Sequence, residues 1–514
     1  MPSTRDPAIA SLAGAVLMPG FCGAQVPDWL SRAVEGGLGG VCLFAPNVGA
    51  DVAALTGALH GVRSDLLVAS DEEGGEVTRL EAATGSSWPG HGALGRLDDL
   101  DSTRRIAAAI GRQARQAGVD LVLAPDADVT SNPDNPVIGL RSFGTDPELV
   151  ARHTAAFVEG VQRTAVAACA KHFPGHGDTR TDSHLGLPVI DVDVETLRRR
   201  DLPPFSAAIS AGVRAVMTAH VVFPALDGSP ATLSPTVLGL LRGELGFRGV
   251  IMSDALDMKA ISAGVGRGRG AVLALAAGVD LVCIGNPNHP TPYDDEAAFH
   301  EVHDALVEAV AAGQLSRGRL EEAAQQVADL ARWVAEAQSP RSQAAARESD
   351  ERSDEASDDR SDAHEVAHTV ARLVLDTHGT PRAGTPLHLL DLRGTPNVAA
   401  GPRPSGVVTA LRARFTGLTV HHVAGDAETI STLAGILAGA LAAADGESLV
   451  VLTGSPHRSP GMQRLLDAVV AARPDTVVVA TGLPDERDRL GGHWVRTWGD
   501  SLPAGHAVAT LLLD

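Results

Sequence analysis

Eight short apolar runs rich in β-branched residues recur along the first 290 residues, and amphipathic or alanine-rich stretches separate them. Runs without polar alternation are typical of parallel strands buried on both faces, and the stretches between them are long enough for crossover helices. Eight such units in about 300 residues predict a (β/α)8 TIM barrel, although a doubly wound open sheet would show the same alternation. The expected strands are Gly14–Met18, Gly39–Phe44, Leu66–Ser70, Val119–Ala124, Ala165–Ala170, Val213–Thr218, Gly249–Met252 and Asp280–Ile284.

Polar and titratable residues follow the carboxyl ends of most of these runs. In a barrel of this kind the carboxyl ends of the strands meet on one face, where side chains from several loops converge on the active site. We therefore expect an enzyme whose site is built from the residues directly after the strands. These are Asp71, Asp126, Asp128, Lys171, His172, His220 and Asp254.

The remainder of the chain predicts a second, smaller α/β domain. A helical pattern over Leu315–Ala337 is followed by a stretch dominated by Ser, Asp, Glu, Arg and Ala, which is typical of a solvated linker. Apolar runs then resume at Leu387–Leu390, Leu418–Val423, Leu449–Leu452 and Thr476–Ala480. We expect residues 1–338 to form the barrel, 339–365 an acidic linker and 366–514 a C-terminal α/β sandwich domain.

The composition excludes several classes of partner. The 514 residues carry a net charge of −21, which repels nucleic acid and anionic membrane surfaces. No run approaches the ~20 apolar residues that a membrane span requires. The four cysteines are widely spaced in apolar segments and the N-terminus does not resemble a signal peptide, so we expect buried thiols and a cytoplasmic location.

The segment KHFPGHGDTRTDSHLGL, residues 171–187, concentrates titratable groups on the loop after the fifth expected strand. Lys171 is one of only two lysines among the 42 Lys and Arg residues. Its presence here indicates that this position requires a compact ammonium group rather than a guanidinium. Other interpretations remain open: a Gly- and Pro-rich turn, a metal site formed by His172, His176 and Asp178, or Lys171 as a Schiff-base nucleophile.

Two further segments place acidic residues directly after strands. In GVIMSDALDM, Asp254 follows the seventh expected strand, where it is either a catalytic carboxylate or a helix N-cap. In ASDEEGGEVTRLE, Asp71 follows the third expected strand and Arg79 lies further round the loop, unless the segment is only a Gly-Gly turn with solvated charges.

These segments, together with SNPDNPVIGLRSFG before the fifth expected strand, resemble a known family. KHFPGHGDTRTDSH, SDALDM, DEEGGEVTR and SNPDNPVIGLRSFG are similar to the motifs of glycoside hydrolase family 3, in its branch of β-N-acetylglucosaminidases. The resemblance covers the barrel, and the second domain resembles the α/β sandwich that follows the barrel in many members. Two positions depart from the branch: Glu76 stands where it often has Arg, and Ala255 where a second Asp is common. These departures affect the pocket and the aglycone rather than the reaction.

The resemblance implies a role for each matching residue. Asp254 matches the family's nucleophile, and Asp182 with His184 matches its acid/base dyad on a mobile loop. The sugar would be held by Asp71, Arg79, Arg141, Lys171 and His172.

A histidine suits the second role because imidazole exchanges a proton near neutral pH, and a neighbouring carboxylate can fix its tautomer. We therefore expect a retaining β-N-acetylglucosaminidase that acts on terminal β-linked N-acetylglucosamine, with peptidoglycan fragments as its source and with no metal or cofactor. Two alternatives are a phosphorylase that uses phosphate as the acceptor for β-N-acetylglucosaminides or β-glucosides, and an inactive sugar-binding scaffold. An inactive scaffold would be expected to have lost Asp254 or the dyad.

Overall fold

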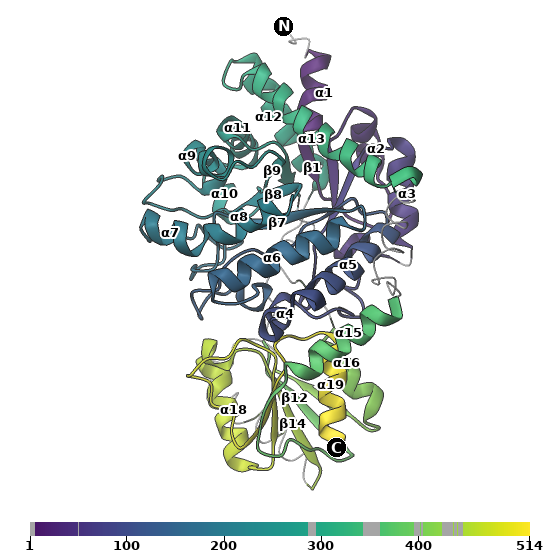
Figure 1. Ribbon diagram of the computed structural model, residues 1–514, viewed down its shortest axis with the longest axis vertical. Coiled ribbons are helices and arrows are strands. Elements are labelled where there is room, and N and C mark those ends of the chain that lie inside the picture. Colours follow the sequence, from purple (N-terminus) through teal and green to yellow (C-terminus); the bar gives the residue numbers. More distant parts are fainter. Residues whose placement is uncertain are drawn as a thin grey trace.

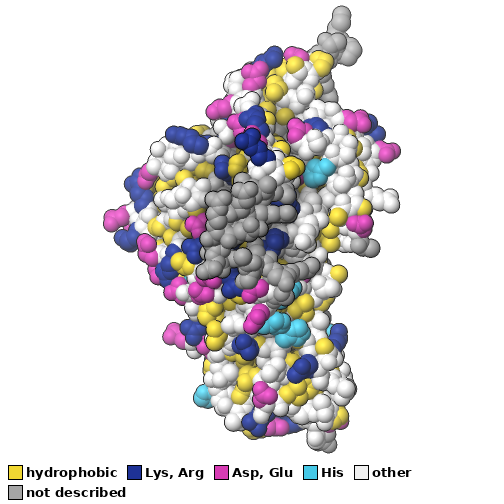
Figure 2. Space-filling view, turned by 45° about the vertical axis from the view of Figure 1, so that its right-hand side comes forward, with side chains coloured by type: hydrophobic (Ala, Val, Ile, Leu, Met, Phe, Trp, Pro, Cys, Tyr) yellow, Lys and Arg dark blue, Asp and Glu magenta, His cyan; other side chains and the backbone are white. Residues whose placement is uncertain are grey.

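A computed structural model gives the structure of the protein and describes residues 6–49, 51–285, 294–342, 360–394, 401, 404–423, 435, 439 and 446–514. Its upper part in Figure 1 is built of parallel strands surrounded by helices, and its lower part is a second sheet flanked by helices. Figure 2 shows basic and acidic side chains interspersed over both parts. No helix within the described residues is both long enough and apolar enough to cross a bilayer.

The upper part is a parallel α/β barrel, as the sequence predicts. Six parallel strands pair in the order β2-β3-β6-β7-β8-β9, and β1 pairs with β10. Single parallel bridges, Gly20 with Cys42 and Met252 with Leu281, connect the β1-β10 pair to both edges of the six-stranded sheet. The strands are β1 Leu17–Pro19, β2 Gly40–Leu43, β3 Leu67–Ser70, β6 Leu121–Val122, β7 Ala167–Phe173, β8 Ala215–Thr218, β9 Val250–Ser253 and β10 Val282–Ile284.

Helices follow these strands around the outside. They are α2 Asp28–Glu35, α3 Val52–Val62, α4 His91–Leu97, α5 Leu100–Gln116, α6 Pro147–Gln162, α7 Val194–Arg200, α8 Leu202–Ser210, α9 Pro235–Gly239, α10 Lys259–Ser262, α11 Arg267–Ala277 and α12 Asp295–Ala311. A short hairpin, β4 Glu72–Gly74 and β5 Val77–Thr78, lies between β3 and α4.

The interior of the barrel is closed at the amino ends of its strands, opposite the site, by α13, Arg317–Ala337. Val327, Leu330, Ala331 and Val334 of this helix share one apolar cluster with the inward-facing strand residues, including Met18. This packing holds the strands rigidly, so the loops at their carboxyl ends are carried on a fixed frame.

The first expected strand is placed too early. Residues Pro7–Ala15 form helix α1, and only Leu17–Pro19 enter the sheet. The helix begins there because the Asp6 side chain accepts a hydrogen bond from the backbone N–H of Ala8, and Pro7 occupies the first helical position. The cysteine expectation is also wrong at one position, because Cys22 is exposed while Cys42, Cys169 and Cys283 are buried.

The lower part is a six-stranded mixed sheet in the order β11-β16-β15-β14-β12-β13. Apolar clusters join α18 to one face of the sheet, and α16 and α19 to the other. The four expected strands are found, while β11 and β16 were not predicted. The strands are β11 Asp376–His378, β12 Leu387–Asp391, β13 Thr419–His422, β14 Ser448–Thr453, β15 Val477–Ala480 and β16 His493–Arg496; the helices are α16 Gly406–Arg414, α18 Pro460–Ala472 and α19 Leu502–Leu513.

Helix α15, Arg360–Leu373, connects the two parts and begins inside the range that was expected to be linker. It contacts α5 of the barrel and α19 of the second part. The helix forms because Ala363, Ala367 and Val370 recur at helical spacing and are buried in the barrel's apolar cluster. Residues 343–359 of the expected linker lie outside the described residues.

Candidate active site

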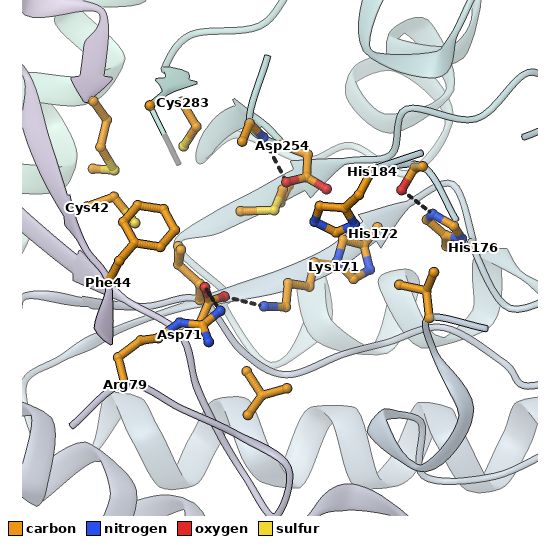
Figure 3. Close-up of a pocket in the computed structure, with 18 of the residues that line it drawn as sticks. Cys42, Phe44, Asp71, Arg79, Lys171, His172, His176, His184, Asp254 and Cys283 are labelled. Carbon is orange, nitrogen blue, oxygen red and sulfur yellow. Dashed lines mark hydrogen bonds and ion pairs between the residues drawn. The ribbon is translucent and has the colours of Figure 1, made fainter. Parts of the chain in front are cut away.

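The carboxyl ends of the barrel strands surround a cavity, and most of the residues singled out from the sequence line it (Figure 3). Asp182, Asp126, Asp128 and His220 do not line it, and Asp182 instead contacts His184 from behind. The residues that line the cavity are Asp71, Arg79, Arg141, Lys171, His172, His184 and Asp254, and His176, Ser183, Cys42 and Cys283 also contribute to its wall. Residues as distant in the sequence as Asp71 and Asp254 are therefore brought to one site.

Asp71 is fixed by two cations at the wall of this cavity. Lys171 Nζ lies 2.7 Å from one carboxylate oxygen, and Arg79 Nη2 lies 3.0 Å from the other. Burial opposes ionisation of Asp71, but the charges of Lys171 and Arg79 outweigh burial and hold its pKa at about 2. Asp71 is therefore a carboxylate at neutral pH, with lone pairs left to accept hydroxyl groups.

Glu73 is a buried partner that the sequence interpretation did not identify. It accepts two hydrogen bonds from Arg141, at 3.0 and 2.8 Å, and lies 2.7 Å from Lys171 Nζ. Burial opposes the charge of Lys171, but Asp71 and Glu73 outweigh it and raise the pKa of the ammonium. A permanently protonated lysine cannot attack a carbonyl, so this environment argues against Lys171 as a Schiff-base nucleophile.

His172 is held neutral next to the same cluster. Its Nδ1–H donates to Asp128 at 2.8 Å, and burial followed by the charge of Arg141 lowers its pKa to about 4. Burial raises the pKa of Asp128 to about 7, although the backbone N–H groups of His176 and His172 oppose that shift. The imidazole thus presents Nε2 as a hydrogen-bonding atom without a positive charge.

Asp126, Asp128 and His172 carry ligand-type atoms within 4.8 Å of one another, so they are a group that could hold a metal ion. However, Arg141 Nη2 already lies 3.6 Å from Asp126, and the Nδ1 proton of His172 points at Asp128. The Arg141 guanidinium therefore already supplies a positive charge beside these acidic groups.

The metal ligands considered from the sequence are not brought together. Both ring nitrogens of His176 are bonded, to Thr179 at 2.9 Å and Ser183 at 3.0 Å, while Asp178 pairs with Arg200 at 2.9 Å. His176 is therefore a structural group that shapes the loop after β7.

The loop after β7 also carries the His184–Asp182 pair. Nδ1 of His184 donates to Asp182 at 2.8 Å, and the backbone N–H of His184 donates to the same oxygen at 2.8 Å. Burial raises the pKa of Asp182, but the hydrogen bond and charge of His184 outweigh it and lower the pKa. With Nδ1 so engaged, Nε2 of His184 faces the cavity and has no bonded partner in the described part of the chain.

Asp254 follows β9 and faces the cavity from the side opposite Asp71 (Figure 3). One of its oxygens accepts a hydrogen bond from the backbone N–H of Ala255 at 2.7 Å. Burial raises the pKa of Asp254, but the imidazoles of His220, His172 and His184 outweigh this effect and lower it. Asp254 is not a helix N-cap, because α10 begins only at Lys259 with Met258 before it.

His220 follows the sixth expected strand and holds the backbone segment that binds Asp254. Its Nδ1 accepts from Thr232 Oγ1 at 2.8 Å, and its Nε2–H donates to the carbonyl of Ala255 at 3.1 Å. The backbone of Ala255, which binds Asp254, is therefore held by a side chain from the neighbouring strand end. Burial lowers the pKa of His220, consistent with a neutral ring.

Replacing Glu73 by alanine should destabilise the barrel by about 3–5 kcal/mol, because it leaves the buried Arg141 without its main counter-charge and Lys171 with Asp71 alone. The matched control is Glu321→Ala, which removes an exposed ion pair with Arg317 at 2.8 Å and should cost less than about 1 kcal/mol. Urea unfolding followed by circular dichroism compares the two. Equal losses would show that the Glu73 cluster is not an important source of stability.

Comparison with known proteins follows the same division of the chain. Residues 30–330 match the model of the glycosyl hydrolase family 3 N terminal domain. A β-hexosaminidase of Stenotrophomonas maltophilia (strain R551-3) is 37% identical over 308 residues, covering 58% of this chain and 89% of that protein. Beta-hexosaminidase A of Pseudoalteromonas piscicida is 35% identical over 319 residues, which are 57% of this chain and 53% of that longer protein.

Similarity to solved structures extends over the whole chain. The glycoside hydrolase family 3 β-N-acetylglucosaminidase from Paenibacillus sp. str. FPU-7 superimposes with a TM-score of 0.83 at 31% identity, covering 100% of this chain and 97% of that one. The similarity therefore extends through the second sheet as well as the barrel.

Proposed function

Because the chain belongs to glycosyl hydrolase family 3, in its β-hexosaminidase branch, we propose that it is a retaining β-N-acetylglucosaminidase that works through a glycosyl-enzyme on Asp254. The observation that carries this proposal is the shared cavity: an ionised carboxylate and a histidine with a free Nε2 face the space between them, beside a charged cluster that can hold a sugar. Peptidoglycan fragments are the proposed source of the sugar, on the resemblance to this branch.

In the first step His184 Nε2–H protonates the glycosidic oxygen while Asp254 attacks the anomeric carbon, so the leaving group departs as an alcohol. In the second step neutral His184 takes a proton from water, and the resulting hydroxide displaces Asp254 from the anomeric carbon. Two inversions give net retention, and His184 ends protonated as it began. Asp182 keeps the proton on Nδ1 in the neutral ring and stabilises the imidazolium.

The sugar is oriented by the remaining residues. Asp71 accepts from hydroxyl groups, while Lys171 and Arg79, already fixed on Asp71, donate to them. Arg141 and the neutral His172 complete the wall. Because the ion pairs exist before substrate binds, these contacts need little reorganisation during the reaction.

The substrate assignment predicts a strong preference for an aryl β-N-acetylglucosaminide over the corresponding aryl β-glucoside, by at least about tenfold in kcat/KM. Product analysis by NMR should show the β-anomer first, in the presence and in the absence of phosphate. Preference for the glucoside would overturn the substrate assignment, and a glycosyl phosphate product would show that phosphate, not water, is the acceptor.

A further inference from the structure

We propose that Arg487, in the second part of the chain, is a positioning residue for the loop that carries Asp182 and His184. It would act through Asp134, on the segment 131–138 that follows β6. This inference rests on the proposed role of His184. It assigns a function to the second sheet, and to a sequence motif of which the proposed reaction uses only Arg141.

The segment 131–138 lies directly against the loop after β7. The Asn135 side-chain amide donates to the carbonyl of His176 at 2.9 Å and to Thr179 at 3.2 Å. Asn132 makes longer bonds, of 3.4 Å, from its backbone and side-chain nitrogens to the carbonyls of Gly177 and Asp178.

At Gly177 the loop after β7 lies directly against the backbone of Val129, and a Cβ at this position would lie 1.8 Å from the Val129 carbonyl oxygen. No residue other than glycine can be accommodated at this position without moving the backbone. The position of the loop with His184 therefore depends on the position of residues 129–138, which lie against it.

Asp134 links this segment to the second part of the chain. Its backbone N–H donates to the side-chain oxygen of Asn132 at 3.0 Å, which turns the Asn132 amide nitrogen toward Asp178. Its carboxylate accepts a hydrogen bond from Arg487 Nη2 at 2.7 Å, and that bond lowers the pKa of Asp134. Movement of Asp134 would be transmitted to the two asparagines and from them to the loop.

The Arg487 side chain is also fixed by residues of its own loop. Asp485 accepts from the backbone N–H, Nε and Nη2 of Arg487, at 2.8, 2.7 and 2.8 Å. Asp488 binds the backbone of Asp485 at 3.2 Å and pairs with the buried His457 at 2.8 Å and with Arg496 at 3.0 Å.

An isolated exposed ion pair contributes little, chiefly because ordering two long side chains costs entropy. Here the arginine is already ordered by its own loop, so less entropy is lost when it binds Asp134. The contact between the two parts is therefore suited to holding a loop in one place.

The test compares Arg487→Ala with Arg489→Ala in the full chain. Arg489 lies two residues away, is exposed and pairs with Asp467 inside the second part, so its loss leaves the loop after β7 untouched. Arg487→Ala should lower kcat/KM about threefold to tenfold for an alkyl N-acetylglucosaminide, whose leaving group needs a proton. For an activated aryl N-acetylglucosaminide, kcat/KM should change by less than about twofold, because kcat/KM reports the glycosylation step and that step does not depend on His184 with such a leaving group.

Two further measurements separate positioning from a general loss of structure. Hydrogen exchange of residues 174–187 should become faster in Arg487→Ala and not in Arg489→Ala. In a double-mutant cycle, Asp134→Asn combined with Arg487→Ala should be no worse than either single variant.

Equal losses of kcat/KM on both substrates, additive effects in the cycle, or a result identical to Arg489→Ala would overturn the assignment of Arg487. If His184→Ala itself shows no dependence on the leaving group, the proposed reaction fails instead.

Discussion

Replacing Asp254 by alanine should reduce kcat by about three orders of magnitude or more on every substrate, activated aryl glycosides included, because it removes the group that forms the glycosyl-enzyme. The sugar contacts of Asp71, Lys171 and Arg79 remain in this variant. N-acetylglucosamine should therefore still bind, with an affinity within about tenfold of the unchanged protein. Steady-state kinetics and calorimetric titration with N-acetylglucosamine measure the two effects.

Asp254→Asn serves as the control for an altered fold, because its side-chain oxygen can still accept the hydrogen bond from Ala255. The same loss of rate with an unchanged thermal unfolding temperature would show that the variants lack the nucleophile and not the fold. A rate within about tenfold of the unchanged protein in both variants would contradict the assignment of Asp254.

Replacing His184 by alanine should separate substrates by their leaving groups. Alkyl and sugar leaving groups need a proton as they depart, so their kcat/KM should fall by about 10²–10⁴-fold. Activated aryl leaving groups depart without that proton, and their kcat/KM should fall far less. A series of aryl and alkyl N-acetylglucosaminides of graded leaving-group pKa gives the slope of rate on leaving-group pKa, which should become steeper in the variant.

Azide or formate should partly restore turnover of the aryl substrates in this variant, since a small nucleophile can replace the water that His184 activates. Asp182→Asn should produce a weaker effect in the same direction, because it preserves the hydrogen-bonding shape but changes the tautomer and basicity of the imidazole. Uniform losses across the leaving-group series would contradict the acid/base role.

The pattern of buried strands and polar strand ends predicted most of the architecture. All eight barrel strands lie within or beside the expected runs, because fully buried parallel strands produce continuous apolar segments that differ clearly from helices. The first strand was placed too early because a short apolar helix, Pro7–Ala15, runs directly into it. The two strands missed in the second sheet, β11 and β16, are short, and β11 is half exposed with a polar sequence.

The residues lining the cavity were predictable because strand ends converge in this fold, but the residues behind them were not. Glu73 is the last of three consecutive acidic residues, and nothing in the local sequence shows that its carboxylate is buried against Arg141. His220 could be located at a strand end, whereas its contact with Ala255 depends on how two neighbouring loops fold. Contacts between residues distant in sequence, such as Asp134 and Arg487, require the assembled structure.

The most direct test of the central assignment is to trap the covalent intermediate. A 5-fluoro N-acetylglucosaminyl fluoride keeps the acetamido group and slows both steps, while its good leaving group lets the glycosyl-enzyme accumulate. Peptide mass spectrometry of the trapped protein should find one N-acetylglucosaminyl-derived mass, on the peptide that contains Asp254 and at that residue. A label on Asp71 or Asp257, or turnover with inversion and no trapped species, would contradict the mechanism.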